Sequence, residues 1–266
     1  MSLMGSRVND YESHEDIPTQ KYFHESTYVK LFDLLGVYRP DEISCRFSSF
    51  HHHYDDRFAN DTLPYEQVIP HLKALMQTYL STMSAIGVET WIMHGTLLAW
   101  WWNEKIFPWD NDLDVQISEP AIHILAKSFN MTQHHFDLPS VEGGRNYMLD
   151  VNPYYVVQST EDKLNMIDAR WIDMSSGLFI DITAVRKDEE RRRKGNPEAL
   201  RCKDRHRYHA SEIFPLRDSY FEDVPVKVPY AYTELLKREY GSKALAQTEF
   251  SDHRFNEHTK IWEAMG

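Results

Sequence analysis

The sequence predicts an α/β or α+β fold in which helices flank a mixed β-sheet. Three observations predict it. Residues 65–86 repeat apolar side chains every three or four positions, the period of an amphipathic helix. Short apolar runs such as 88–93 and 178–183 have the length and composition of buried strands. Helical and strand-like segments alternate along a chain of 266 residues, which is long enough to bury a substantial core.

The N-terminal quarter differs from the rest. Residues 1–20 are polar and acidic without periodicity, so we expect a mobile N-terminus. Residues 21–64 are rich in aromatic residues and histidine, and we expect an irregular arm packed on a main body at 65–260. The run His51–His53 is expected to pack within this arm or at the surface. Three consecutive residues of a helix or strand cannot share one face, which argues against a metal site.

The main body is expected to begin with the helix at 65–86, which Gly87 ends. Ser118 can cap a later helix, and Pro120 suits its first turn. The elements expected after the first helix are a strand at 88–93, a helix at 96–103, a strand at 112–117, a helix at 119–129, strands at 147–151, 164–172 and 178–183, a charged loop or helix face at 187–194, a strand or hairpin at 220–228 and a helix at 230–240.

Composition excludes several classes of protein. Apolar residues make up 42% of the chain and aromatic residues 13%, which excludes a disordered chain. The formal net charge of −12 makes nucleic acid a poor partner. No stretch approaches the ~18 apolar residues that span a bilayer, and no apolar signal core is visible. We therefore expect a soluble chain with no transmembrane segment, which could still be part of a longer anchored protein. The pairing of Cys45 and Cys202 stays open.

The segment Trp109–Val115 carries the most informative pattern. Asp112 and Asp114 are two positions apart on a predicted strand, so both side chains face one side, roughly 7 Å apart at the backbone. Two carboxylates at the edge of an apolar core are costly unless they are paired or bind a metal. Oxygen ligands suit Mg²⁺ or Mn²⁺, so we expect a divalent cation here. Asp110 is a weaker ligand candidate, because it follows Pro108 and could instead shape the turn.

Asp181 lies in the apolar run at 178–183, where a lone carboxylate is unusual. If this strand neighbours the strand of Asp112, three carboxylates converge. They could then complete a two-metal clamp, or Asp181 could take the proton of an incoming hydroxyl. The alternative is a core carboxylate bonded to a backbone N–H group or to an arginine such as Arg170.

Several further residues are candidates for binding phosphate or an organic ring. Gly95 and Thr96 lie between a predicted strand and helix, where backbone N–H groups bind phosphate; the alternative is an ordinary turn capped by Thr96. Lys105 and Arg170 could neutralise phosphate oxygens, or could be ordinary surface cations. Trp100–Trp102 are expected to form core and groove wall, and an aromatic face there could stack on a base or sugar.

The segments His94–Leu98 and Lys105–Val115 together resemble the LicD family, which includes bacterial phosphocholine transferases and the fukutin-related proteins. Lys21–Glu25 and His53–Phe58 look like the fungal branch that is linked to mannosylphosphorylation of glycans. The resemblance covers roughly residues 20–255, and its further matching pieces are Gly177–Ile182, Ile213–Leu216 and Phe221–Tyr240.

The resemblance implies an α+β, nucleotidyltransferase-like fold. In it, Gly95 and Thr96 match the phosphate-side turn. Asp112 and Asp114 match the metal carboxylates, and Asp181 matches the third acid. The family moves a phospho-sugar or phospho-alcohol from a nucleotide diphosphate donor to a glycan hydroxyl. We therefore expect transfer of mannose 1-phosphate from GDP-mannose to a glycan or glycoprotein, with Mg²⁺ or Mn²⁺. Family analogy suggests the Golgi.

Two other functions stay open at this point. A non-catalytic chain could keep the fold and promote a partner mannosylphosphate transferase, a role with which fungal relatives are associated. The clustered acids argue against a pure scaffold. Nucleotidyl transfer from a nucleoside triphosphate would use the same carboxylates. The bulky run Trp100–Trp102 departs from the small residues of many LicD relatives and leaves the donor preference open.

Overall fold

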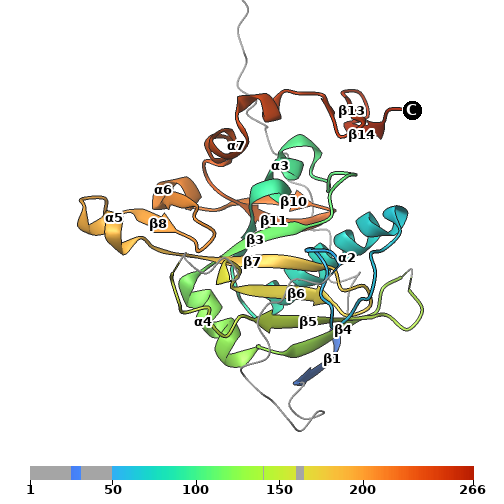
Figure 1. The fold of residues 1–266 in the computed structure, drawn as a ribbon, viewed down its shortest axis with the longest axis horizontal. Coiled ribbons are helices and arrows are strands. Elements are labelled where there is room, and N and C mark those ends of the chain that lie inside the picture. Colours follow the sequence, from blue (N-terminus) through green and yellow to red (C-terminus); the bar gives the residue numbers. More distant parts are fainter. Residues whose placement is uncertain (1–24, 31–49, 140, 160–164) are drawn as a thin grey trace, which may run out of the picture.

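The computed structural model describes residues 25–30, 50–139, 141–159 and 165–266. They form an α+β body around a mixed sheet, as the sequence predicts (Figure 1). The helices are α2 (Tyr65–Ala85), α3 (His94–Asn103), α4 (Glu119–Ser128), α5 (Glu189–Arg193), α6 (Ala210–Ile213), α7 (Tyr232–Tyr240) and the 3-10 helix η3 (Ser242–Leu245). The strands are β1 (Glu25–Lys30), β2 (Thr90–Ile92), β3 (Leu113–Ser118), β4 (Thr132–Phe136), β5 (Arg145–Val151), β6 (Ala169–Asp173), β7 (Phe179–Lys187), β8 (Ala199–Arg201), β9 (Arg207–His209), β10 (Arg217–Phe221), β11 (Val224–Val228), β12 (Glu249–Phe250), β13 (His253–Asn256) and β14 (Ile261–Ala264).

The main sheet has the strand order β1-β4-β5-β6-β7-β3-β2, and β8 and β9 extend it from β7. β3 runs parallel to β7. The pairs β2–β3, β4–β5, β5–β6 and β6–β7 are antiparallel. β10 and β11 form a separate hairpin, and β12, β13 and β14 form a third sheet. Figure 1 shows α3 and α7 together beyond the β3 end of the main sheet. The parallel β3–β7 pair therefore lies directly beneath the helices that border the candidate site.

Helix α2 covers one face of the sheet. Its apolar positions, spaced by three or four residues, are buried, and Tyr79 lies edge-on against Trp171 of β6 with 6.4 Å between ring centroids. Trp171 also donates a hydrogen bond from Nε1 to Thr78 Oγ1 (3.1 Å). Burial of each such large apolar side chain stabilises the fold by about 1.5–3 kcal/mol. Because side chains alternate along a strand, Arg170 of β6 points to the opposite face.

The predicted N-terminal arm contributes to the sheet. β1 pairs antiparallel with β4 at the sheet edge. Further along, Tyr54 forms a bridge with Leu178 and is buried. The turn it meets requires glycine, because Gly177 has a φ of +78° and a Cβ there would come within 2.7 Å of Ala59 Cβ. Residues 1–20 and Cys45 lie outside the described residues.

Most predicted elements correspond to observed ones. The helix expected at 65–86 is α2, and the strand at 112–117 is β3. The strand expected from 164 instead begins at Ala169, as β6. β4 was not predicted, because its sequence Thr-Gln-His-His-Phe carries few apolar residues, and neither were the short strands β12–β14.

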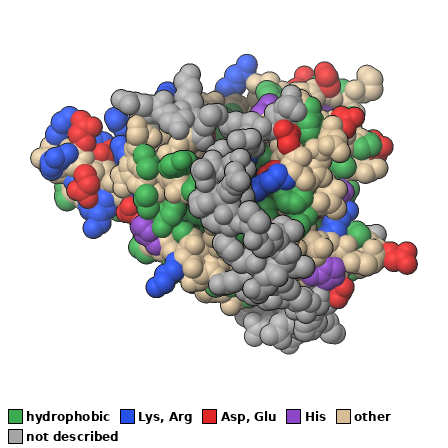
Figure 2. Space-filling view, turned by 60° about the horizontal axis from the view of Figure 1, so that its bottom comes forward, with side chains coloured by type: hydrophobic (Ala, Val, Ile, Leu, Met, Phe, Trp, Pro, Cys, Tyr) green, Lys and Arg blue, Asp and Glu red, His purple; other side chains and the backbone are tan. Residues whose placement is uncertain are grey.

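The charged run at 187–194 contains the short helix α5, with no buried residue. Asp188 caps it, since its side chain accepts a hydrogen bond from the Arg191 backbone N–H (3.1 Å). Figure 2 shows Lys and Arg side chains mixed with acidic ones at this end of the molecule. The prediction of a solvated helix face is confirmed. None of the described helices has the length and apolar character that a bilayer crossing requires.

Candidate functional site

A row of charged side chains crosses the sheet face opposite α2. Asp150 on β5 is the register partner of Arg170 on β6, and Arg170 is the partner of Asp181 on β7. Asp181 is in turn the partner of Asp114 on β3. Register partners on neighbouring strands lie side by side on one face. Arg57 extends the row at its other end, because its Nη2 lies 2.6 Å from Asp150 Oδ2. Four adjacent strands thus hold a continuous line of ionisable groups.

Positive and negative charges alternate in this row until it reaches β3. Arg170 donates from Nε to Asp181 Oδ1 at 2.9 Å, is 1% exposed, and places its guanidinium 3.8 Å from the Phe179 ring centroid. Asp114 comes next, beside Asp181 rather than beside a cation. The row therefore ends in adjacent carboxylates on the two parallel strands.

The acidic end is left without a Lys or Arg partner. Within the described ranges, no Lys or Arg nitrogen lies within 4.0 Å of the carboxylates of Asp110, Asp112 or Asp114. The imidazole of His53 is near, with its Nδ1 3.6 Å from Asp112 Oδ2. Asp112 is 42% exposed, so the cluster opens to solvent. The site thus combines excess negative charge with an approach for a hydrated cation.

The pKa directions show that these acids interact. Burial and the neighbouring Asp112 carboxylate together raise the pKa of Asp110 to about 8. Burial also raises the pKa of Asp114 well above its ordinary value; His94 opposes this, while Asp112 and Asp181 add to it. Burial raises the pKa of Asp181 in spite of Arg170. A cation among these groups would stabilise their ionised forms.

The turn that opens α3 is tied to the acidic end. The backbone N–H of Asp114 donates to Thr96 Oγ1 at 2.8 Å, and the Asp114 carbonyl accepts from Met93 N–H at 3.1 Å. Thr96 is 1% exposed. The first residue of the helix, His94, has a φ of +54°. The hydroxyl of Thr96 therefore fixes the start of the helix against β3, next to the carboxylates.

His94 lies at the same turn, and one of its two ring nitrogens has a partner among the described residues. Its Nδ1 is 2.7 Å from Glu239 Oε1, at the end of α7. Its Nε2 is buried and has no hydrogen-bond partner among the described residues. Burial acts to lower the pKa of His94, but the Glu239 carboxylate, with a contribution from Asp114, raises it above its ordinary value. The structure thus places a buried imidazole, whose raised pKa favours its protonated form, beside Asp114.

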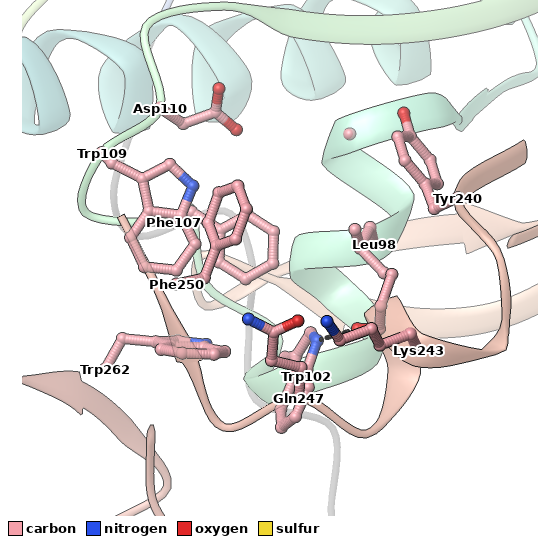
Figure 3. Close-up of a pocket in the computed structure, with 12 residues that line it drawn as sticks. Leu98, Trp102, Phe107, Trp109, Asp110, Tyr240, Lys243, Gln247, Phe250 and Trp262 are labelled. Carbon is pink, nitrogen blue, oxygen red and sulfur yellow. Dashed lines mark hydrogen bonds between the residues drawn. The ribbon is translucent and has the colours of Figure 1, made fainter. Parts of the chain in front are cut away.

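An aromatic pocket of about 420 Å³ adjoins the acids. Figure 3 shows Asp110 and Tyr240 at one end of it, and Trp102, Lys243 and Gln247 at the other. Its remaining lining comes from Gly95, Leu98, Phe107, Trp109, Ala244, Phe250 and Trp262. Ring faces with a few polar groups are suited to a sugar or a nucleobase.

Comparison with known proteins identifies the family. Residues 87–231, more than half of the chain, match the family described as LicD/FKTN/FKRP, nucleotidyltransferase domain. The chain belongs to the LicD family.

Two curated relatives of the chain are yeast proteins. The chain is 34% identical over 166 residues to Mannosyltransferase regulator 4 of Saccharomyces cerevisiae, and 32% identical over 166 residues to Mannosyltransferase regulator 14 of the same organism. Each alignment covers 62% of this chain but only 13% and 16% of those proteins, so the chain spans a small part of their length. The resemblance noted in the sequence is confirmed.

The candidate site brings together some of the predicted residues, and other predicted residues form pairs elsewhere. Asp112, Asp114 and Asp181 converge, with Asp110 beside them. Lys105 instead bonds through Nζ to Asp223 in the turn of the β10–β11 hairpin. Similarly, Arg170 bonds to Asp181, the alternative that the sequence left open, and Gly95 and Thr96 stand at the start of α3 as expected.

Sequence reasoning missed three residues of this site. His94 was visible next to Gly95, but its partner Glu239 is 145 positions away, so no local pattern could pair them. His53, expected to pack within the arm or at the surface, lies beside Asp112. Three consecutive residues cannot share one face in a helix or strand. The segment is a turn, and the rings of His51 and His53 gather with centroids 5.3 Å apart.

Proposed function

We propose that this LicD-family chain is a metal-dependent transferase that moves a phospho-sugar from a nucleotide diphosphate donor to a glycan hydroxyl. The favoured donor is GDP-mannose. The observation that carries the proposal is the acidic end of the charged row, where Asp112 and Asp114 meet Asp181 without a nearby Lys or Arg for the first two in the described part of the chain. Carboxylate oxygens of this kind fit Mg²⁺ or Mn²⁺. A bound cation would neutralise charge on the phosphoryl group.

The proposed reaction has two parts, a bond exchange at phosphorus and a proton transfer. The acceptor oxygen must form a bond to the sugar-side phosphorus while the bond from that phosphorus to the bridging oxygen breaks, releasing a nucleoside monophosphate. The hydroxyl proton must go to a base, which we assign as Asp181. Its hydrogen bond from Arg170 holds the carboxylate in place on the strand.

Phosphate oxygens need donors, and the start of α3 supplies them. Gly95 and Thr96 provide backbone N–H groups at a helix start. His94 adds a buried Nε2 whose hydrogen-bonding capacity is unused among the described residues. Its raised pKa favours the imidazolium, which donates from both ring nitrogens. We propose that Nε2–H donates a hydrogen bond to a phosphate oxygen of the sugar nucleotide.

The aromatic pocket is the proposed place for the nucleoside of the donor. It shares Asp110 and Gly95 with the acidic end, so a ring in the pocket and a diphosphate at the acids can belong to one molecule. The faces of Trp102 and Trp109 offer stacking surfaces, and Lys243 and Gln247 offer polar contacts.

The test is a direct assay of products. Purified chain would be incubated with GDP-mannose, Mn²⁺ and a mannan oligosaccharide, and GMP and the new phosphodiester would be measured by chromatography and ³¹P NMR. Asp112→Asn should lower turnover at least about 10³-fold while the variant stays folded. The matched control is Asp218→Asn, an 89% exposed acid on β10, which should keep full activity. Full activity in the Asp112 variant would rule out this mechanism.

A second function is favoured by the names of the two yeast relatives, which are mannosyltransferase regulators. In that case the chain would promote a separate mannosylphosphate transferase without turning over a donor. Adding the chain to such a transferase separates the two functions. A raised rate with no turnover by the chain alone, across a panel of sugar nucleotides, supports the regulator. Release of pyrophosphate from a nucleoside triphosphate supports nucleotidyl transfer instead.

A further inference from the structure

A second group of side chains that could hold a metal ion borders the aspartates. His94, His206 and Glu239 each offer one ligand atom, and these atoms all lie within 4.8 Å of one another. They come from three separate segments, namely the start of α3, the loop between β8 and β9, and the last turn of α7. We propose that this group binds one Zn²⁺ ion.

The distances suit a small tetrahedral ion. His94 Nδ1 lies 2.7 Å from Glu239 Oε1, and His206 Nε2 lies 3.9 Å from the same oxygen. Zinc bonds of about 2.0–2.1 Å require ligand atoms roughly 3.3–3.5 Å apart, between these two values. Small side-chain shifts therefore complete the site. His206 and Glu239 are 34% and 22% exposed, so an ion can enter and a water can fill the fourth position.

The donor set selects zinc over the cation of the acidic end. Two imidazoles and one carboxylate form a mixed nitrogen and oxygen set, which suits Zn²⁺. The aspartates offer oxygen alone, which suits Mg²⁺ or Mn²⁺. The two sites are neighbours, but the chemistry of their ligands is different.

The surroundings of His206 orient its ring for binding a metal. Its Nδ1 faces Cys202 Sγ at 3.9 Å and Asp204 Oδ2 at 3.7 Å, which leaves Nε2 on the side of Glu239. Groups of this kind behind a ligating histidine orient its ring toward a metal.

The ion would have a defined structural consequence. It would join α3, the β8–β9 loop and α7 through one centre. Zn²⁺ would displace the proton that Nδ1 of the His94 imidazolium otherwise donates to Glu239. The ring then keeps its other proton on Nε2, the buried atom that has no hydrogen-bond partner among the described residues.

Zinc titration of the metal-free chain tests the proposal. The protein would be stripped with a chelator and titrated with Zn²⁺ against a chromophoric competitor, and with Co²⁺ while its visible absorption is recorded. We expect one tight equivalent in the wild type and at least 100-fold weaker binding in His206→Gln and Glu239→Gln. Zinc should also raise the Tm of the wild type and not that of the two variants.

Three controls locate the ion. His258→Gln changes an exposed histidine in the turn before β14, and His52→Gln changes the exposed member of the histidine run beside Asp112. Asp112→Asn changes the acidic end. All three should keep the zinc affinity of the wild type. Circular dichroism shows which variants are folded. One folded variant of the two, His206→Gln or Glu239→Gln, is enough to test the site. Unchanged affinity in a folded ligand variant, loss of binding in a control, or no stoichiometric zinc in the wild type would overturn the proposal.

Discussion

Arg170 determines how charge is balanced across the sheet face. Its side chain is 1% exposed, bonds to Asp181 and lies over the Phe179 ring. An arginine held this way serves the fold and the orientation of Asp181 more directly than it serves a substrate. The same carboxylate is the one assigned to take the acceptor proton, so stability and chemistry are coupled at this residue.

Removing Arg170 should be costly. Arg170→Met keeps much of the side-chain volume but leaves the Asp181 carboxylate without its guanidinium, and removing one partner of a buried pair costs about 3–5 kcal/mol. Urea unfolding followed by circular dichroism measures this. Lys227→Met is the control, because it breaks an exposed pair with Asp218 and should cost less than about 1 kcal/mol. A similarly small loss in Arg170→Met would contradict the account.

At the scale of elements, the α3–β3 junction holds the site together. The Thr96 hydroxyl on α3 accepts a hydrogen bond from the backbone N–H of Asp114 on β3. This one bond fixes the start of the helix relative to the carboxylates. Thr96→Val should leave this N–H group without an acceptor and cost about 1–3 kcal/mol of stability. Thr96→Ser retains the hydroxyl and should cost clearly less. Equal unfolding midpoints for the two variants would show that the hydrogen bond contributes nothing.

The elements also explain what the sequence could predict. The prediction that Asp112 and Asp114 lie on one side used only local information, their spacing of two positions. Asp112 directly precedes β3 and Asp114 lies within it. The position of Asp181 beside Asp114 depends on the parallel β3–β7 pairing, which the sequence raised only as a condition. The contact of His94 with Glu239 joins residues 145 positions apart and depends on how α7 packs, so local pattern could not give it.

The strand β4 shows a similar limit for the fold. Its two histidines break the apolar signal, although His134 is buried against Trp171 with ring centroids 5.0 Å apart. Burial of a polar ring is decided by its neighbours in the sheet and not by its own sequence. The long helix α2, whose apolar period extends over its whole length, was by contrast predicted to within a residue.

For the whole molecule, the acidic end makes stability depend on pH. Burial raises the pKa of Asp110 from its ordinary 3.8 to about 8 in the folded chain. Its stabilising contribution is therefore complete below the unfolded pKa and is lost as pH rises toward and through about 8. The metal-free wild type should lose on the order of 1–2 kcal/mol more than Asp110→Asn between pH 6 and 8.

Thermal and urea unfolding at several pH values, with a chelator present, measure this difference. Because ligands must be deprotonated, the affinity for Mn²⁺ should rise over the same interval. If the free energy of unfolding depended equally on pH in the two proteins, the Asp110 carboxyl would be ionised in the folded chain at neutral pH. This result would contradict the raised pKa of Asp110.

Binding of Mn²⁺ is the most direct test of the claim that the acids of β3 and β7 hold a divalent cation. Free Mn²⁺ would be measured by electron paramagnetic resonance during titration of the chelator-treated chain at pH 8. His206→Gln serves as the control for binding at the histidine group. We expect one or two bound ions per chain, with binding retained in His206→Gln and weakened at least 100-fold in a folded Asp112→Asn, Asp114→Asn double variant. Equal binding by the double variant and the wild type, or no binding by either, would contradict it.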